Sequence, residues 1–415
     1  EHDLPADGRC GSMLCVVGQA TRASLPEQPD VTHLAQIGFT SALTALPRPP
    51  LNLVAVVDVS GSMEGEPLET VKASLHALRE QLRPSDQLTI VTFSDTAMLT
   101  LSATSSSRAQ QSAIDALHTQ GSTALSAGMA LGFEQARQSR QRFDGLTRVV
   151  VLTDQQPNVG PTSASGFMAQ ASQAAEEGIG MTLIGVAAHF GAELAQQVST
   201  VRGANLFYFS DLAKMRARFS EELPTMMVPL AYGMQLTVEP AEGVEIAGLY
   251  GLPGSAVDWT ESGGLSMEVA TLFPSTRGGG IFLGMAGEGS RLGTLTLSYD
   301  PLDGPPVHQE VPMPVVPQRK AWTGLTRGAA LVDAYTALVQ TCTRYHEGDI
   351  SGAAAVASDA LARLPADPVY DADRARLVAL HGLIAPQDPL SRRDPLSGCL
   401  FIHISEPTRQ PCISY

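Results

Sequence analysis

Oxygen-bearing side chains alternate directly after an apolar run early in the chain. The run "LNLVAVV" covers residues 51–57, and Asp58, Ser60 and Ser62 follow it at every second position. In a loop that curls over the end of a buried strand, alternate side chains can point toward one spot. Carboxylate and hydroxyl oxygens are hard donors, which suit Mg²⁺, Mn²⁺ or Ca²⁺ and bind zinc poorly. Alone, the same spacing also describes an ordinary turn or helix N-cap, so the motif does not establish a metal site.

Two further oxygen donors occur where other predicted elements begin or end. Thr123 lies in "GSTAL", just ahead of a predicted helix, and Asp154 directly follows the apolar run "RVVVLT". Taken singly, the threonine is most simply a helix N-cap and the aspartate a turn residue. Together with the first motif they give two carboxylates and three hydroxyls, few negative charges for a divalent cation. Such a site keeps positions open for water or for an incoming carboxylate.

The elements that would position these residues alternate between apolar runs and amphipathic stretches. The run at 51–58 has the uniform apolarity of a strand that is buried on both faces. The stretch 68–82 then carries leucine and valine at helical spacing. Similar pairs continue to residue 225, which predicts an α/β fold with a doubly wound, mostly parallel sheet. Ligand sites in such sheets lie beyond the carboxyl ends of the strands, where all the candidate ligands fall.

The remaining sequence predicts three other kinds of structure. Short alternating segments parted by Gly and Pro indicate a β-rich, sandwich-like region, and amphipathic stretches after it indicate helices. The first 50 residues contain two candidate short strands, and the apolar segment "CLFIHIS" near the end could pair with them. We therefore expect an N-terminal segment over 1–50 and a doubly wound domain over 51–225. A β-rich domain over 226–318, a helical region over 319–386 and a tail over 387–415 should follow.

Residues 51–223 resemble a von Willebrand factor type A (VWA) domain. The resemblance rests on "DVSGSM", "LRPSDQLTIVTFS", "GSTAL" and "RVVVLTD". It implies a Rossmann-like fold with a metal-ion-dependent adhesion site formed by Asp58, Ser60, Ser62, Thr123 and Asp154, and a bound Mg²⁺, Mn²⁺ or Ca²⁺. Gln155 departs from the glycine that usually follows the last aspartate, which affects the shape of the loop more than its ligands. The wider pattern is similar to bacterial proteins related to the inter-alpha-trypsin inhibitor heavy chains.

Composition restricts the partners and the compartment. The formal net charge of −15 argues against nucleic acid or an anionic membrane surface as partner. No segment has the roughly 18 consecutive apolar residues that span a bilayer. The chain starts with Glu1, so a leader sequence could have been removed. Bridges among the terminal cysteines, with Cys342 left free, would suit an extracellular, periplasmic or cell-surface protein; free thiols in a cytoplasmic protein are the alternative.

Other chemical motifs are weak. The chain contains no H-E-x-x-H, G-x-S-x-G or lysine-bearing phosphate loop, so we predict that it is not an enzyme. His189 falls at a predicted strand end on the same edge as the metal loops, where an ordinary loop residue is the simpler interpretation. Cys342 and His346 are four residues apart on a predicted helix, a spacing that usually reflects packing.

Two functions are consistent with these observations. The first is a cation-dependent protein-binding or adhesion module, whose metal accepts an Asp or Glu carboxylate from a protein partner. The second is an accessory subunit of an ATPase-driven assembly or metal-insertion machine, because type A domains also occur beside such ATPases.

Overall fold

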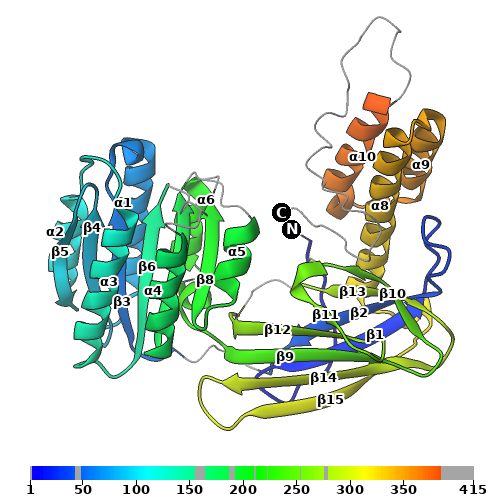
Figure 1. The fold of residues 1–415 in the computed structure, drawn as a ribbon, viewed down its shortest axis with the longest axis horizontal. Coiled ribbons are helices and arrows are strands. Elements are labelled where there is room, and N and C mark those ends of the chain that lie inside the picture. The colour runs from blue at the N-terminus through cyan, green and yellow to red at the C-terminus, as the bar shows by residue number, and fades with distance from the viewer. Residues whose placement is uncertain are drawn as a thin grey trace, which may run out of the picture.

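The computed structural model describes residues 2–42, 48–154, 164–186, 192–209, 212–221, 223–252, 254–274 and 279–384. A six-stranded sheet forms the first layered unit (Figure 1). Its strand order is β5-β4-β3-β6-β7-β8, and every neighbouring pair is parallel except the edge pair β4 and β5. The predicted doubly wound, mostly parallel sheet is confirmed. The strands are β3 (Leu51–Asp58), β4 (Gln87–Phe93), β5 (Ala97–Thr104), β6 (Leu146–Thr153), β7 (Ile179–Val186) and β8 (Ala204–Phe209).

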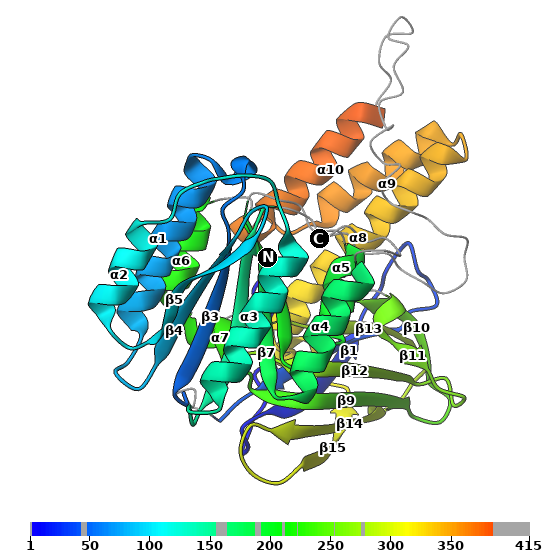
Figure 2. The same cartoon turned by 60° about the vertical axis from the view of Figure 1, so that its left-hand side comes forward.

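Helices cover both faces of this sheet, as Figure 2 shows. One face packs on α1 (Glu66–Gln81), α2 (Ser107–Asp115), α6 (Leu212–Glu221) and α7 (Leu223–Met227). The other packs on α3 (Leu125–Arg140), α4 (Ala164–Glu176) and α5 (Ala192–Ser199). Because both faces are covered, β3 is buried along its whole length, which explains its continuous apolar run.

The order of the strands reverses beside β3. From β3 the chain moves outward to β4 and β5, then returns to form β6 on the other side of β3. Such a reversal creates a crevice at the carboxyl ends of the two central strands. Asp58 ends β3 and Asp154 directly follows β6, so the topology brings the two predicted carboxylate ligands to this crevice.

Two antiparallel sheets form the β-rich unit and enclose a second apolar core. The four-stranded sheet has the order β1-β2-β13-β10 and the five-stranded sheet β11-β12-β9-β14-β15. The two predicted N-terminal strands are confirmed, and they pair through β13 with the β-rich region. The division into domains remains a prediction. The strands are β1 (Cys15–Arg22), β2 (His33–Thr40), β9 (Ala231–Pro240), β10 (Glu245–Tyr250), β11 (Asp258–Trp259), β12 (Leu265–Leu272), β13 (Ile281–Ala286), β14 (Arg291–Pro301) and β15 (Val307–Pro314).

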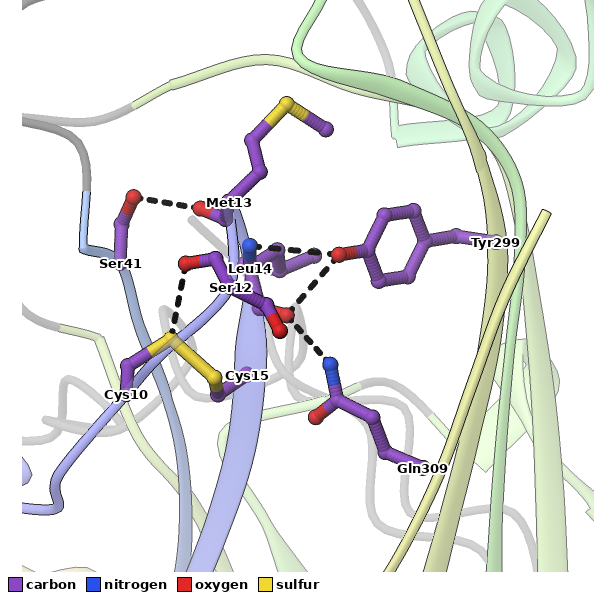
Figure 3. Close-up of a disulfide and its surroundings, with 8 residues drawn as sticks. All are labelled: Cys10, Ser12, Met13, Leu14, Cys15, Ser41, Tyr299 and Gln309. Atoms are coloured by element: carbon purple, nitrogen blue, oxygen red, sulfur yellow. Dashed lines mark hydrogen bonds between the residues drawn. A yellow bond between two sulfur atoms is a disulfide. The ribbon is translucent and has the colours of Figure 1, made fainter. Parts of the chain in front are cut away.

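The N-terminal segment is attached to the five-stranded sheet beside a disulfide between Cys10 and Cys15 (Figure 3). The carbonyl oxygen of Leu14 accepts hydrogen bonds from the Tyr299 hydroxyl at 3.0 Å and the Gln309 amide at 2.6 Å. The Leu14 N–H in turn donates to the Tyr299 hydroxyl oxygen. The disulfide lies within the N-terminal segment, and the buried Cys342 forms no disulfide with another described residue. Cys399 and Cys412 lie outside the described residues, as does the predicted tail strand.

Among the described residues, three α-helices follow the β-rich unit: α8 (Thr323–His346), α9 (Ile350–Arg363) and α10 (Asp371–Ile384). The first half of α8 packs on the outer face of the four-stranded sheet, where Gly328 lets the helix approach the ring of Phe282. Its second half packs with α9 and α10. In the described part of the chain, no helix is long and apolar enough to cross a membrane.

The amino ends of strands in the six-stranded sheet contact the β-rich unit. The Gly203 N–H donates to the Thr271 hydroxyl at 2.6 Å, and the Arg202 guanidinium lies 4.0 Å from the centre of the Tyr232 ring. Arg148 is fully buried, and its guanidinium carbon lies 5.1 Å from the centre of the Phe273 ring. Burial lowers the pKa of Arg148 to about 10. These contacts lie at the amino ends of the strands, away from the edge that carries Asp58 and Asp154.

Candidate metal centre

Asp58 is completely buried, and both of its carboxylate oxygens accept hydrogen bonds. Oδ1 accepts the backbone N–H of Ser60 at 2.9 Å, and Oδ2 accepts the hydroxyl of Thr153 at 2.6 Å. The first bond curls the loop back over the end of β3. The second links Asp58 to the last residue of β6. Hydrogen bonds of this kind fix the orientation of the carboxylate.

The two serines link Asp58 to Asp154. The Ser60 and Ser62 hydroxyls lie 3.1 Å apart, and Ser62 donates to Asp154 Oδ1 at 3.0 Å. A short 3₁₀ turn over Gly61–Met63 gives the loop its curvature, and the fully buried side chain of Met63 anchors it in the core. The alternation seen in the sequence therefore brings both hydroxyls to the side of the loop that faces Asp154.

Asp154 is half-buried, and its pKa is raised. Burial is the largest cause, and the negative charge of Asp58 adds to it, while the hydrogen bond from Ser62 opposes both. Within the described ranges, no Lys, Arg or His forms a salt bridge with either carboxylate. Two carboxylates thus share a partly buried site in which no described cationic side chain pairs with them, an arrangement that a bound cation would stabilise.

Thr123 lies on a turn that is hydrogen-bonded to the Asp58 loop. The N–H of Gln120 donates to the Val59 carbonyl at 2.7 Å, and the N–H of Gly61 donates to the Gly121 carbonyl at 3.2 Å. The half-buried Thr123 follows two residues later, before α3. The structure therefore brings the three predicted segments, which carry Asp58, Thr123 and Asp154, to one edge of the sheet.

The donor set fits a hard divalent cation. It offers two carboxylates and three hydroxyls, the oxygen chemistry that Mg²⁺, Mn²⁺ and Ca²⁺ prefer. Among the described residues, no group of three or more His, Cys, Asp and Glu side chains could hold a metal. A cation site here therefore depends on the Ser and Thr hydroxyls in addition to the two carboxylates.

Sequence reasoning missed two residues that hold segments of this site. Thr153 holds Asp58, and its position next to Asp154 at the end of a buried strand was the available signal. Asp95, in the turn between β4 and β5, accepts the N–H of Ser122 at 2.8 Å and also its hydroxyl. Gln155 and His189 lie outside the described residues, so their predicted roles are untested.

The other candidate groups have structural roles. Cys342 packs in a small core with Ala353 and Leu380 from the two following helices. His346 is exposed at the end of α8 and stacks edge-on against Tyr345. The interpretation of the Cys342–His346 spacing as helix packing is thus supported.

Comparisons with known proteins agree with the fold. Residues 52–221 match the family model of the von Willebrand factor type A domain. The chain thus contains a VWA domain, as the sequence motifs predicted. This class of domain fits a metal-dependent adhesion or protein-interaction module.

Curated relatives match part of the chain. The uncharacterized protein YfbK of Escherichia coli K12 is 28% identical over 195 residues, which are 46% of this chain and 34% of YfbK. The chain therefore spans about a third of that relative's length. Inter-alpha-trypsin inhibitor heavy chain H4 of Bos taurus is 29% identical over 123 residues, which are 28% of this chain and 13% of that protein.

One solved structure is similar over almost the whole chain. The von Willebrand factor type A protein from Catenulispora acidiphila superposes with a TM-score of 0.52 and 13% identity, covering 92% of this chain and 93% of that one. At this identity the likeness concerns the fold alone. It extends the shared fold beyond the VWA domain to most of the described structure.

Proposed function

We propose that this chain is a divalent-cation-dependent protein-binding module and not an enzyme. Asp58, Ser60, Ser62, Thr123 and Asp154 would hold Mg²⁺, or Mn²⁺ or Ca²⁺ in its place. The observation that carries the proposal is the pair Asp58 and Asp154, which are linked through two serine hydroxyls at the strand-order reversal and form no salt bridge with a Lys, Arg or His of the described residues. A divalent cation would neutralise this pair.

The same donor set suits a site that binds a protein partner. When bound, the cation would supply a Lewis acid to which an Asp or Glu of a partner can bind. The two carboxylates carry only as much negative charge as a divalent cation balances, and the hydroxyls are neutral. Asp58 is held by Thr153 and Ser60, which keeps its oxygens oriented without adding charge.

The remaining features support an exported location. The Cys10–Cys15 disulfide is typical of oxidising compartments, so we propose that the chain is extracellular, periplasmic or on the cell surface. A bovine inter-alpha-trypsin inhibitor heavy chain is among its relatives. The net charge of −15 disfavours nucleic acid as the partner and fits one that reaches an acidic surface through a bridging cation.

Binding of a carboxylate can be tested with acetate as the probe. Mn²⁺-loaded protein should increase the relaxation rate of the acetate methyl protons in NMR, because acetate would bind next to the paramagnetic ion. Asp154→Ala should abolish this increase, and Asp115→Ala, which removes one exposed charge of the same domain, should leave it unchanged. Relaxation no faster than that of acetate with unloaded protein would contradict the proposal.

Capture from native extract with and without EDTA then identifies the partner. We expect a protein that is retained in Mg²⁺, is released by EDTA and is not retained by Asp154→Ala. Retention of an ATPase that is insensitive to EDTA would instead favour the accessory-subunit function.

A further inference from the structure

Asp95 lies beside the candidate metal centre and has no part in the ligand set. It occupies the turn between β4 and β5, which is closed by the Ser94 N–H donating to the Thr96 carbonyl at 3.0 Å. The end of β4 pairs with the end of β3, where Phe93 is the partner of Asp58. The turn therefore lies at the same edge of the sheet as the candidate metal centre.

Hydrogen bonds from this turn hold the chain on both sides of Thr123. Before it, Asp95 Oδ1 accepts the backbone N–H of Ser122 at 2.8 Å and also the Ser122 hydroxyl. After it, the N–H of Ala124 donates to the Ser94 carbonyl at 2.6 Å. With its two neighbours fixed, Thr123 has little backbone freedom.

Gly121 adapts to the same contact. Its φ of +64° favours glycine, and a Cβ atom at this position would overlap Asp95 Oδ2. Its carbonyl oxygen accepts the N–H of Gly61 from the loop that carries Ser60 and Ser62. The glycine thus lets one short turn contact the Asp95 carboxylate on one side and the Asp58 loop on the other.

We propose that Asp95 is a positioning residue of the cation site: its carboxylate orders the Gly121–Ala124 turn and so holds Thr123 against the Asp58 loop. This inference rests on the proposed function, since it assigns Asp95 a role in cation affinity. Asp95 acts by accepting hydrogen bonds, so asparagine, which keeps an acceptor oxygen, replaces it better than alanine does. Mutation of residues that orient metal ligands in this way typically lowers metal affinity by about 10- to 100-fold.

The test is a Mn²⁺ titration by calorimetry of EDTA-treated wild type, Asp95→Ala, Asp95→Asn and the charge-matched control Asp115→Ala. We expect Asp95→Ala to weaken binding by about 10- to 100-fold. Asp95→Asn should recover most of that loss, and Asp115→Ala should bind as wild type does. The melting temperature of each variant in EDTA is measured alongside, because a residue with a structural role alone would lower it and leave the affinity unchanged.

The outcomes separate this inference from the proposed function. If wild type binds no Mn²⁺, both fail. If wild type binds and Asp95→Ala binds equally well, the role of Asp95 fails alone. An Asn variant as weak as the Ala variant would also overturn it, because Asp95 would then act through its charge. Ser122→Ala, which removes only the hydroxyl donor, should give a smaller loss than Asp95→Ala and tests the contact should the latter not fold.

Discussion

Replacing Asp86 with alanine should destabilise the VWA domain without changing its cation affinity. Asp86 precedes β4 at the edge of the sheet opposite the candidate metal centre, and its side chain is completely buried. Oδ1 accepts the N–H of Leu51 at 2.9 Å, while Oδ2 accepts the Arg48 guanidinium and the N–H of Arg83, each at 2.7 Å. The Asp86 carboxylate thereby fixes the start of β3 and balances the positive charge of the nearly buried Arg48.

The magnitude follows from what the substitution leaves unpaired. Burial lowers the pKa of Arg48, and the charge of Asp86 opposes this effect, so the charged guanidinium depends on its partner. Removing one member of such a buried pair costs about 3–5 kcal/mol. The buried N–H of Leu51 loses its acceptor as well, which costs about 1–3 kcal/mol on its own and is not simply additive. We therefore expect a loss of about 3–5 kcal/mol.

Hydrogen exchange detected by mass spectrometry suits this measurement. Both tryptophans, Trp259 and Trp322, lie outside residues 52–221, so tryptophan fluorescence would not report the unfolding of this domain. Peptides from β3 and β4 should exchange roughly two to nearly four orders of magnitude faster in Asp86→Ala, since each 1.4 kcal/mol is a factor of ten. Asp115→Ala serves as an exposed control.

A double-mutant cycle with Arg48→Ala tests the cause. If the charge pair dominates, Asp86→Ala should cost less in the Arg48→Ala background by at least about 1 kcal/mol. A total loss below about 1 kcal/mol, or an equal loss in both backgrounds, would refute the reasoning.

Two glycines and one helix cap give further predictions. Gly132→Ala in α3 would place a Cβ atom over Val56 of β3, so we expect a loss of about 1–3 kcal/mol in urea unfolding, with partial recovery in the Gly132→Ala/Val56→Ala double variant. Gly382→Ala in α10 meets no atom within 4 Å and should instead stabilise the protein by about 0.5–1 kcal/mol; a loss there would contradict the packing argument. Asp349 caps α9 through the Gly352 N–H, a bond that lowers its pKa. A group with a depressed folded-state pKa stabilises the fold above its unfolded pKa and loses that effect as the pH falls through the folded value. The difference in melting temperature between wild type and Asp349→Ala should thus be present at pH 7 and shrink below about pH 4; a difference independent of pH would exclude this origin.

The strands that the sequence predicted and those that it did not differ in burial. β3 and β6 are buried on both faces, so their uniform apolarity is visible without neighbours. β5 and β15 are edge strands of their sheets, and neither was predicted. β15 carries Pro312 and Pro314, which an edge strand tolerates because one side of its backbone needs no partner. Where a strand lies in its sheet depends on the whole fold, which local composition does not encode.

The candidate site also contains residues that the sequence predicted and residues that it did not. Asp58, Ser60 and Ser62 are adjacent in sequence, so their spacing alone predicted a shared loop. Thr153 and Asp95 contact residues that are 95 and 27 positions away in the chain. Apart from the position of Thr153 beside Asp154, nothing in their local sequence identifies these contacts. The bonds form because β3, β4 and β6 end at one edge, which becomes known only with the strand order.

Calorimetric titration of Mg²⁺, Mn²⁺ and Ca²⁺ into EDTA-treated protein tests the central claim most directly. Wild type should bind one cation per chain, and Asp58→Ala should bind none. Because Asp58 is buried, Ser62→Ala provides a second variant at an exposed ligand position, with affinity expected to fall while the melting temperature in EDTA is kept. If wild type gives no binding heat with any of the three cations, or if both variants bind as wild type does, the loop after β3 is not a cation site.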